Sequence, residues 1–250
     1  MARTKPVKKN DKTMIRQLKQ KLLTANHILE REQLATPFGH VSVRIPGTET
    51  FLITRSVSPG VATMDDIVVC DMEGKIVQGK FKDTYSEVVI HTGVYKRRKE
   101  FNSVIHSHSQ YVIALSMAGH TVLPANAQAA VVGLEPIAVF EKMLFIDQPA
   151  LGEEIAELLG PNKAVLLRGH GAVVVGDRIE DVIMTARMLE TSARSQWMAR
   201  AVGELRLFTD QERQELVEYF RRIDRPGHGS YREWAYYEEV LKRERRLTRK

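Results

Sequence analysis

Two histidines, His106 and His108, lie two residues apart in an apolar, β-prone stretch of this chain. Alternate residues of a β-strand point to the same face, so a strand here would aim both imidazoles at one point. Glu87 upstream and His170 downstream could complete the set. Three imidazoles and one carboxylate are suitable ligands for a divalent transition metal such as zinc, manganese or iron.

Each of these residues also has an ordinary structural interpretation. Glu87 would lie in the first turn of a helix, where the helix dipole favours an acid. The turn around His170 is flanked by glycines and could be purely geometric. His91 shares a helix face with Glu87, but we expect it on the helix surface rather than in the site. The pair His106 and His108 is the stronger signal, because two buried imidazoles would otherwise need two separate polar partners.

The sequence lacks the motifs of several other catalytic classes. It contains no G-x-S-x-G for a serine hydrolase, and no G-x-G-x-x-G or G-x-x-x-x-G-K-[ST] for nucleotide binding. Cys70 is the only cysteine and has no basic neighbour, so we expect a buried structural thiol. A single cysteine leaves no internal disulfide, which is typical of a cytoplasmic protein.

The elements that must position these residues follow from hydrophobic periodicity and turn residues. We expect a long amphipathic first helix at 12–34 and further helices at 86–98, 109–117, 151–159, 181–202, 210–223 and 231–246. We expect strands or apolar β-type segments at 40–45, 50–54, 67–70, 76–77, 104–109, 121–123, 137–140, 143–145, 164–168 and 172–175. Hairpin-length turns between several of these strands predict an α/β fold with a mixed, largely antiparallel sheet between helical layers.

Length and charge limit how the chain can be organised. It has 250 residues, of which 43% are apolar, enough for a full core. We expect a disordered basic N-terminus at 1–11, one domain at 12–205 and a C-terminal helical extension at 206–250. The net charge of +6 comes from the ends, because residues 1–21 carry +7 and residues 242–250 carry +5. The rest is acidic, so we expect no nucleic-acid partner, and without an apolar run of roughly 20 residues no membrane span.

The order of the motifs resembles the class II aldolase/adducin family over about residues 22–201. The resemblance rests on Gly39-His40-Val41-Ser42-Val43-Arg44, Ile53-Thr54, Ser86-Glu87, His106-Ser107-His108 and Gly169-His170-Gly171. It implies a three-layer αβα sandwich, and a cyclic homotetramer with active sites at subunit interfaces. It also implies one divalent metal per chain (Zn, Mn, Co or Fe) held by His106, His108 and His170. Glu87 would be the fourth ligand or an acid/base.

Several positions depart from the sugar-phosphate aldolases and epimerases of this family, and they lie where those enzymes bind phosphate. His40 replaces an asparagine, Tyr85 replaces a serine, and Arg55 follows Thr54 where those enzymes have a proline. A guanidinium such as Arg55 would suit a planar carboxylate. The segment 124–128 also lacks the tyrosine that aldolases use as a proton donor to a neighbouring site. The motifs of this chain are more similar to those of family members that decarboxylate hydroxylated aromatic or heteroaromatic acids.

The expected function is therefore that of a metal-dependent carbon–carbon lyase acting on a small hydroxy- or oxo-carboxylate through a metal-stabilised enolate. Glu87 and His40 are the catalytic candidates, and the substrate-binding candidates are Gly39, Arg55, Ser56 and Ser86. Decarboxylation is favoured over a sugar-phosphate aldolase or 4-epimerase acting on a sugar-like substrate. Two further alternatives are an iron-dependent oxygenase and a non-catalytic adducin-like module.

The C-terminal extension carries a group of aromatic residues, Trp234, Tyr236 and Tyr237. Their ordinary interpretation is a helix that packs its aromatic face on the body of the protein. The functional alternative is a lid over the site of its own or a neighbouring subunit.

Overall fold

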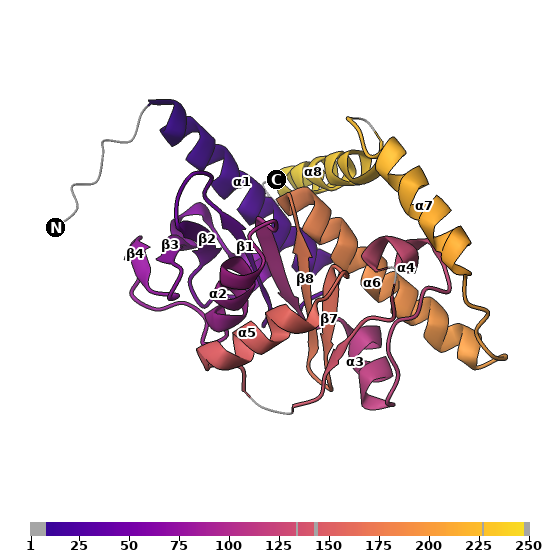
Figure 1. The fold of residues 1–250 in the computed structure, drawn as a ribbon. Coiled ribbons are helices and arrows are strands. Elements are labelled where there is room, and N and C mark those ends of the chain that lie inside the picture. Colours follow the sequence, from indigo (N-terminus) through magenta and orange to yellow (C-terminus); the bar gives the residue numbers. More distant parts are fainter. Residues whose placement is uncertain (1–8, 134, 143–144, 227, 248–250) are drawn as a thin grey trace.

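An eight-stranded sheet lies between two layers of helices in the computed structural model, which describes residues 9–133, 135–142, 145–226 and 228–247 (Figure 1). The strand order is β4-β3-β2-β1-β5-β8-β7-β6. Among the described strands, only the edge pair β6–β7 is parallel. The strands are β1 (His40–Arg44), β2 (Thr50–Thr54), β3 (Ile67–Asp71), β4 (Ile76–Gln78), β5 (Ser103–Ser107), β6 (Val139–Phe140), β7 (Ala164–Leu167) and β8 (Gly171–Gly176). The predicted α/β fold with a mixed, largely antiparallel sheet is confirmed.

The helices divide between the two faces of the sheet. One face carries α1 (Lys9–Arg31), α3 (Gln110–Met117), α4 (Ala127–Val132), α6 (Ile179–Arg200) and α8 (Gly229–Leu247). The other face carries α2 (Val88–Arg97) and α5 (Pro149–Leu158), while α7 (Asp210–Ile223) lies against α4. Strand residues alternate between the two cores, as in β5, where Ile105 faces the first layer and Val104 the second. No described helix is long and apolar enough to cross a membrane.

The segment between α3 and β6 differs from the prediction. The strand expected at 121–123 is wrong, because Gln196 of α6 bonds both the N–H and the C=O of Leu123 in place of a neighbouring strand. Helix α4 was not expected. Asn126 caps it by accepting a hydrogen bond from the Ala129 N–H at 2.8 Å. A short helix of this kind is stabilised by packing on α6 rather than by its own periodicity.

The ends of the chain also differ in detail. Helix α1 begins at Lys9, three residues before its predicted start, and residues 1–8 of the predicted disordered segment lie outside the described residues. Most of the predicted segment 143–145 also lies outside them. In the C-terminal extension, Trp234 and Tyr237 of α8 are buried in the core beside α6, whereas Tyr236 is 58% exposed. The packing interpretation therefore holds for the two buried rings.

Cys70 provides a simple test of the packing between the sheet and α2. Its side chain is fully buried in β3, and burial together with Asp71 raises the pKa of the thiol to about 12. The reactive thiolate is therefore scarce in the native protein at pH 8. We expect a thiol reagent such as Ellman's reagent to leave the folded protein unlabelled and to react with one equivalent after unfolding. Rapid labelling of the native protein would contradict this packing.

Candidate metal centre

The candidate residues gather at one end of the sheet, where β1 begins and β5 ends. His40 is the first residue of β1 and pairs with His106 of β5. The β1–β2 register pairs Ser42 with Ile53, and Arg55 directly follows the end of β2 at Thr54. His170 lies at the same end, in the turn between β7 and β8. The sheet thus brings together residues that are far apart in the sequence.

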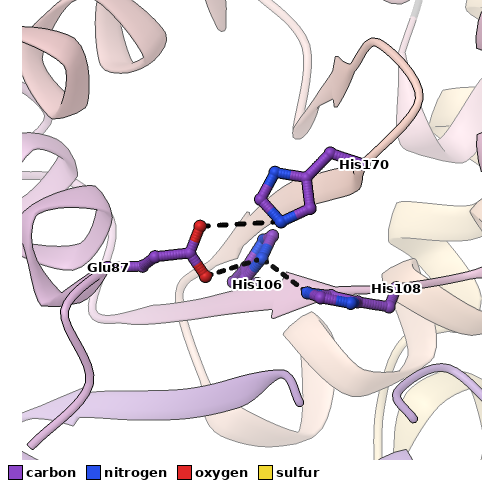
Figure 2. A group of neighbouring side chains, drawn as sticks. All are labelled: Glu87, His106, His108 and His170. Atoms are coloured by element: carbon purple, nitrogen blue, oxygen red, sulfur yellow. Dashed lines mark hydrogen bonds and ion pairs between the residues drawn. The ribbon is translucent and has the colours of Figure 1, made fainter. Parts of the chain in front are cut away.

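Four side chains converge on one point: Glu87, His106, His108 and His170, shown in Figure 2. One donor atom from each lies within 4.8 Å of all the others. Nε2 of His106 is 2.9 Å from Nε2 of His108 and 3.3 Å from Oε2 of Glu87. Oε1 of Glu87 is 3.5 Å from Nε2 of His170. This is the set predicted from the sequence as a metal site.

Local backbone structure positions each of the four. His106 is fully buried in β5, and His108 follows just after the strand ends, where its N–H bonds the Leu34 carbonyl at 2.9 Å. Both rings lie on the same side, as the alternation predicted. Glu87 is the residue before α2 and not part of its first turn. His170 is carried by a tight turn in which Gly169 has a φ of +67°.

The donor set fits a divalent transition metal. Nδ1 of His106 lies 3.2 Å from the Ala172 carbonyl. Since only a protonated Nδ1 can donate there, the Nε2 lone pair is directed at the other three groups. Oε1 of Glu87 is buried without a hydrogen-bond partner among the described residues, which is unusual for a carboxylate unless it binds a ligand. Three imidazoles and a carboxylate around one point are ordinary zinc, manganese or iron ligands.

The charge states match this chemistry. Burial lowers the pKa of His108 to about 3, and the neighbouring His106 and His170 act in the same direction. Burial also lowers the pKa of His170. Burial raises the pKa of Glu87, but its contacts with His106 and His40 outweigh this and hold that pKa below its ordinary value. Neutral imidazoles and an ionised carboxylate are the forms that bind metals.

His40 and His91 form a buried pair beside this cluster. His40 Nε2 lies 3.9 Å from Glu87 Oε2, too far for a hydrogen bond, and its Nδ1 is 2.7 Å from His91 Nε2. The expected surface position of His91 is wrong, because its side chain is fully buried. The reason is that α2 packs its His91 face onto β1, where His40 and Ser42 point towards it.

The expected substrate-binding residues do not converge on one point as the four candidate metal ligands do. Ser56 and Ser86 are exposed. Arg55 donates from Nε to Asp66 at 2.6 Å and from Nη1 to the Ser56 carbonyl at 3.3 Å, and its guanidinium stacks on Phe81. Gly39 has a φ of +108°, and a Cβ there would lie 2.7 Å from that of Ala35. Gly39 therefore has a conformational role at the least.

Sequence reasoning missed the contact between Tyr85 and His40. The two ring centroids are 4.2 Å apart. The Tyr85 hydroxyl donates to the Val57 carbonyl at 2.8 Å and lies 2.7 Å from the Thr54 hydroxyl. The departures from the family motifs marked both positions, but only the sheet and the loop before α2 make them neighbours.

Gly171 has a steric role that a substitution can test. A Cβ at this position would lie 1.9 Å from the Ser107 carbonyl oxygen, between β5, which carries His106, and β8, which begins directly after His170. We expect Gly171→Ala to destabilise the fold by about 2 kcal/mol and to weaken metal binding about tenfold or more by displacing His170. Chemical denaturation and competition with a chelator would measure both effects. Gly203→Ala is the control, because nothing lies within 4 Å of a Cβ there, and equal losses in the two variants would refute the steric argument.

The sequence and the fold of this chain are similar to those of known proteins. Residues 20–197 match the family described as Class II Aldolase and Adducin N-terminal domain. A 3,4-dihydroxyphthalate decarboxylase of Arthrobacter keyseri is 29% identical over 71% of this chain and 77% of its own. An L-fuculose phosphate aldolase of Methanococcus maripaludis is 26% identical over 67% of this chain and 88% of its own. The crystal structure of an aldolase II superfamily protein from Pseudomonas syringae superimposes with a TM-score of 0.79 at 24% identity, covering 97% of this chain and 96% of that one.

Proposed function

Since the chain belongs to the class II aldolase/adducin family, we propose that it is a divalent-metal-dependent carbon–carbon lyase that decarboxylates a small hydroxy- or oxo-carboxylate. The observation that carries the proposal is the convergence of Glu87, His106, His108 and His170. A set of four intact ligand candidates also argues against a non-catalytic adducin-like module. The decarboxylase and aldolase relatives lie at similar identity, so the choice between the two reactions rests on the side chains of the site.

These four residues would hold one metal ion per chain. When bound, the ion would act as a Lewis acid towards adjacent substrate oxygens and stabilise the enolate left by the broken bond. The neutral imidazoles and the ionised Glu87 supply three uncharged ligands and one negative charge. Glu87 or His40, which both border the site, would return a proton to the substrate carbon.

The residues that this chain has at the phosphate-binding positions of the sugar-phosphate enzymes favour decarboxylation of a non-phosphorylated substrate. In this chain two of those positions are His40 and Tyr85, whose rings pack against each other at 4.2 Å. His40 is buried, and the Tyr85 hydroxyl is engaged with Val57 and Thr54. Two packed rings leave less room for a phosphate dianion than a small amide and a serine hydroxyl do.

A carboxylate would be held at the neighbouring strand end. Arg55 directly follows the end of β2, the strand that pairs with β1. Its Nε and Nη1 are engaged with Asp66 and the Ser56 carbonyl, so Nη2 is the group that would hold a carboxylate oxygen. Gly39, Ser56 and Ser86 would complete the substrate pocket around it.

We also propose a homo-oligomer with the site near a subunit interface, as the family resemblance implies. Two exposed apolar side chains belong to segments that contact the site, Phe38 at 69% and Met117 at 71% exposure. The Phe38 ring lies 6.4 Å from that of His108. Ser116, next to Met117, accepts a hydrogen bond from Gly169 in the His170 turn at 3.0 Å. Apolar surface in this position would be covered by a second copy, and light scattering over a range of concentrations would measure the assembly.

The deciding experiment combines metal analysis with product analysis. Purified protein is assayed for bound metals, stripped with a chelator and reloaded with zinc, manganese, cobalt or iron(II) in turn. Each form is then offered hydroxylated aromatic acids, hydroxy- and oxo-carboxylates, and sugar phosphates. We expect about one metal per chain, and metal-dependent release of carbon dioxide from the non-phosphorylated acids.

Other outcomes would overturn this assignment in distinct ways. Cleavage or epimerisation of sugar phosphates without carbon dioxide would establish the aldolase or epimerase alternative. Oxygen consumption by the iron form alone would establish an oxygenase. A protein that binds no metal, even when reloaded, would be a non-catalytic module.

A further inference from the structure

We propose that Tyr95, Ser42 and His91 form a one-directional chain of hydrogen bonds that fixes the tautomer of His40. His40 would then present an Nε2–H to the substrate as a hydrogen-bond donor. The catalytic meaning of this inference rests on the proposed function, whereas the tautomer itself does not. His91, Ser42 and Tyr95 are positioning residues, because they act through His40.

The chain is continuous and buried. His40 Nδ1 lies 2.7 Å from His91 Nε2, His91 Nδ1 lies 2.6 Å from Ser42 Oγ, and Ser42 Oγ lies 2.7 Å from the Tyr95 hydroxyl. Each of the four residues is at most 1% exposed. Two residues alternate on β1 and two are four apart on α2, so the strand and the helix interleave their polar groups.

The direction of the hydrogen bonds follows from counting donors and acceptors. In the part of the chain that the structure describes, Ser42 Oγ is the only hydrogen-bond partner of the Tyr95 hydroxyl. A buried hydroxyl hydrogen without an acceptor is costly, so Tyr95 donates to Ser42. The Ser42 hydroxyl then has its own hydrogen available for His91 Nδ1, which must accept it.

The same count continues to His40. With a bare Nδ1, His91 carries its hydrogen on Nε2 and donates it to Nδ1 of His40. His40 therefore has a bare Nδ1 and carries its hydrogen on Nε2. The opposite direction would leave the Tyr95 hydroxyl hydrogen without an acceptor and would aim a bare His40 lone pair towards the Glu87 carboxylate.

The Nε2–H of His40 is directed at the candidate metal site and makes no hydrogen bond to its residues. It is buried and lacks a hydrogen-bond partner among the described residues, and Glu87 Oε2 lies 3.9 Å away. The Tyr85 ring packs against His40 at 4.2 Å and restricts its rotation. A donor that is held in place but unpaired suits a substrate oxygen on which negative charge develops. The chain of hydrogen bonds thus favours substrates that place a carboxylate or enolate oxygen beside Glu87.

The test measures the tautomer directly and the activity separately. Zinc-loaded, ¹⁵N-labelled protein is examined by NMR through the couplings between ring nitrogens and ring carbon-bound hydrogens, which distinguish a protonated from a bare nitrogen. The His40 signals are assigned by their loss in His40→Gln. We expect His40 to be protonated at Nε2 and bare at Nδ1. Protonation at Nδ1 alone would overturn the inference.

Variants of the chain test whether the tautomer matters. Tyr95→Phe and Ser42→Ala should allow the second tautomer of His40 to appear and lower kcat about tenfold, with metal content unchanged. Tyr219→Phe, a half-exposed tyrosine of α7, is the control and should change neither. A uniform tautomer in both variants, or an unchanged kcat when the tautomer is mixed, would refute the positioning role. Where the wild type shows the expected tautomer but releases no carbon dioxide, the proposed function fails while the tautomer assignment stands.

Discussion

His106→Ala is expected to purify as a folded protein that contains no metal and has lost about a thousandfold or more in kcat/KM. The metal would supply several kcal/mol of transition-state stabilisation, and each 1.4 kcal/mol is a factor of ten. His106 is the central member of the cluster, since its Nε2 lies within 3.3 Å of donor atoms of both His108 and Glu87. Elemental analysis, circular dichroism and kinetics on the same preparation would measure the three quantities.

The matched control is His120→Ala, which changes an exposed histidine outside the cluster. It should keep full metal content and activity, so that a loss common to both variants would indicate general damage. Normal metal content and activity in His106→Ala would show that the four converging side chains are a polar cluster of the apo fold. The metal-dependent mechanism would then have no support.

Trp234→Ala is expected to lower the free energy of unfolding by about 3 kcal/mol and the Tm by roughly 6–12 °C. Trp234 is only 6% exposed and belongs to the core shared by α1, α6 and α8. Its truncation would leave a cavity that the long helices cannot close. Thermal and chemical denaturation of the metal-loaded protein would measure the change.

Tyr236→Ala distinguishes a packing role of α8 from a role as a lid over the active site. Tyr236 lies on the same helix but is 58% exposed, so its removal should change stability by less than about 0.5 kcal/mol. A fall in kcat/KM without loss of stability in this variant would show that α8 reaches an active site, of its own or another subunit. An unchanged kcat/KM would leave α8 as a packing element.

The convergence of Glu87, His106, His108 and His170 was the part of the site that the sequence predicted well. The period of two in a strand determines that His106 and His108 point to one side, whatever the rest of the fold. The glycines around His170 indicate a tight turn, and the structure shows why each is needed: Gly169 has a φ of +67°, and a Cβ at Gly171 would lie 1.9 Å from the Ser107 carbonyl oxygen. A sheet between helical layers likewise follows from the interleaving of strands and helices and from hairpin-length turns, which depend only on local order along the chain.

The environment of His40 is different, because it depends on contacts between elements distant in the sequence. His91 appeared to be a surface residue, since helix periodicity gives the face of α2 on which it lies but not which strand covers that face. The packing of α2 on β1 buries it between His40 and Ser42. In the same way, only the tertiary structure brings Tyr85 against His40 and replaces the expected strand at 121–123 with hydrogen bonds to Gln196.

The sequence by itself therefore determined the candidate ligand types, the shared face of His106 and His108 and the layered fold, because these follow from residue chemistry and local periodicity. Only the tertiary structure decided which buried polar groups satisfy one another, because a hydrogen bond between distant segments depends on packing that no local pattern encodes.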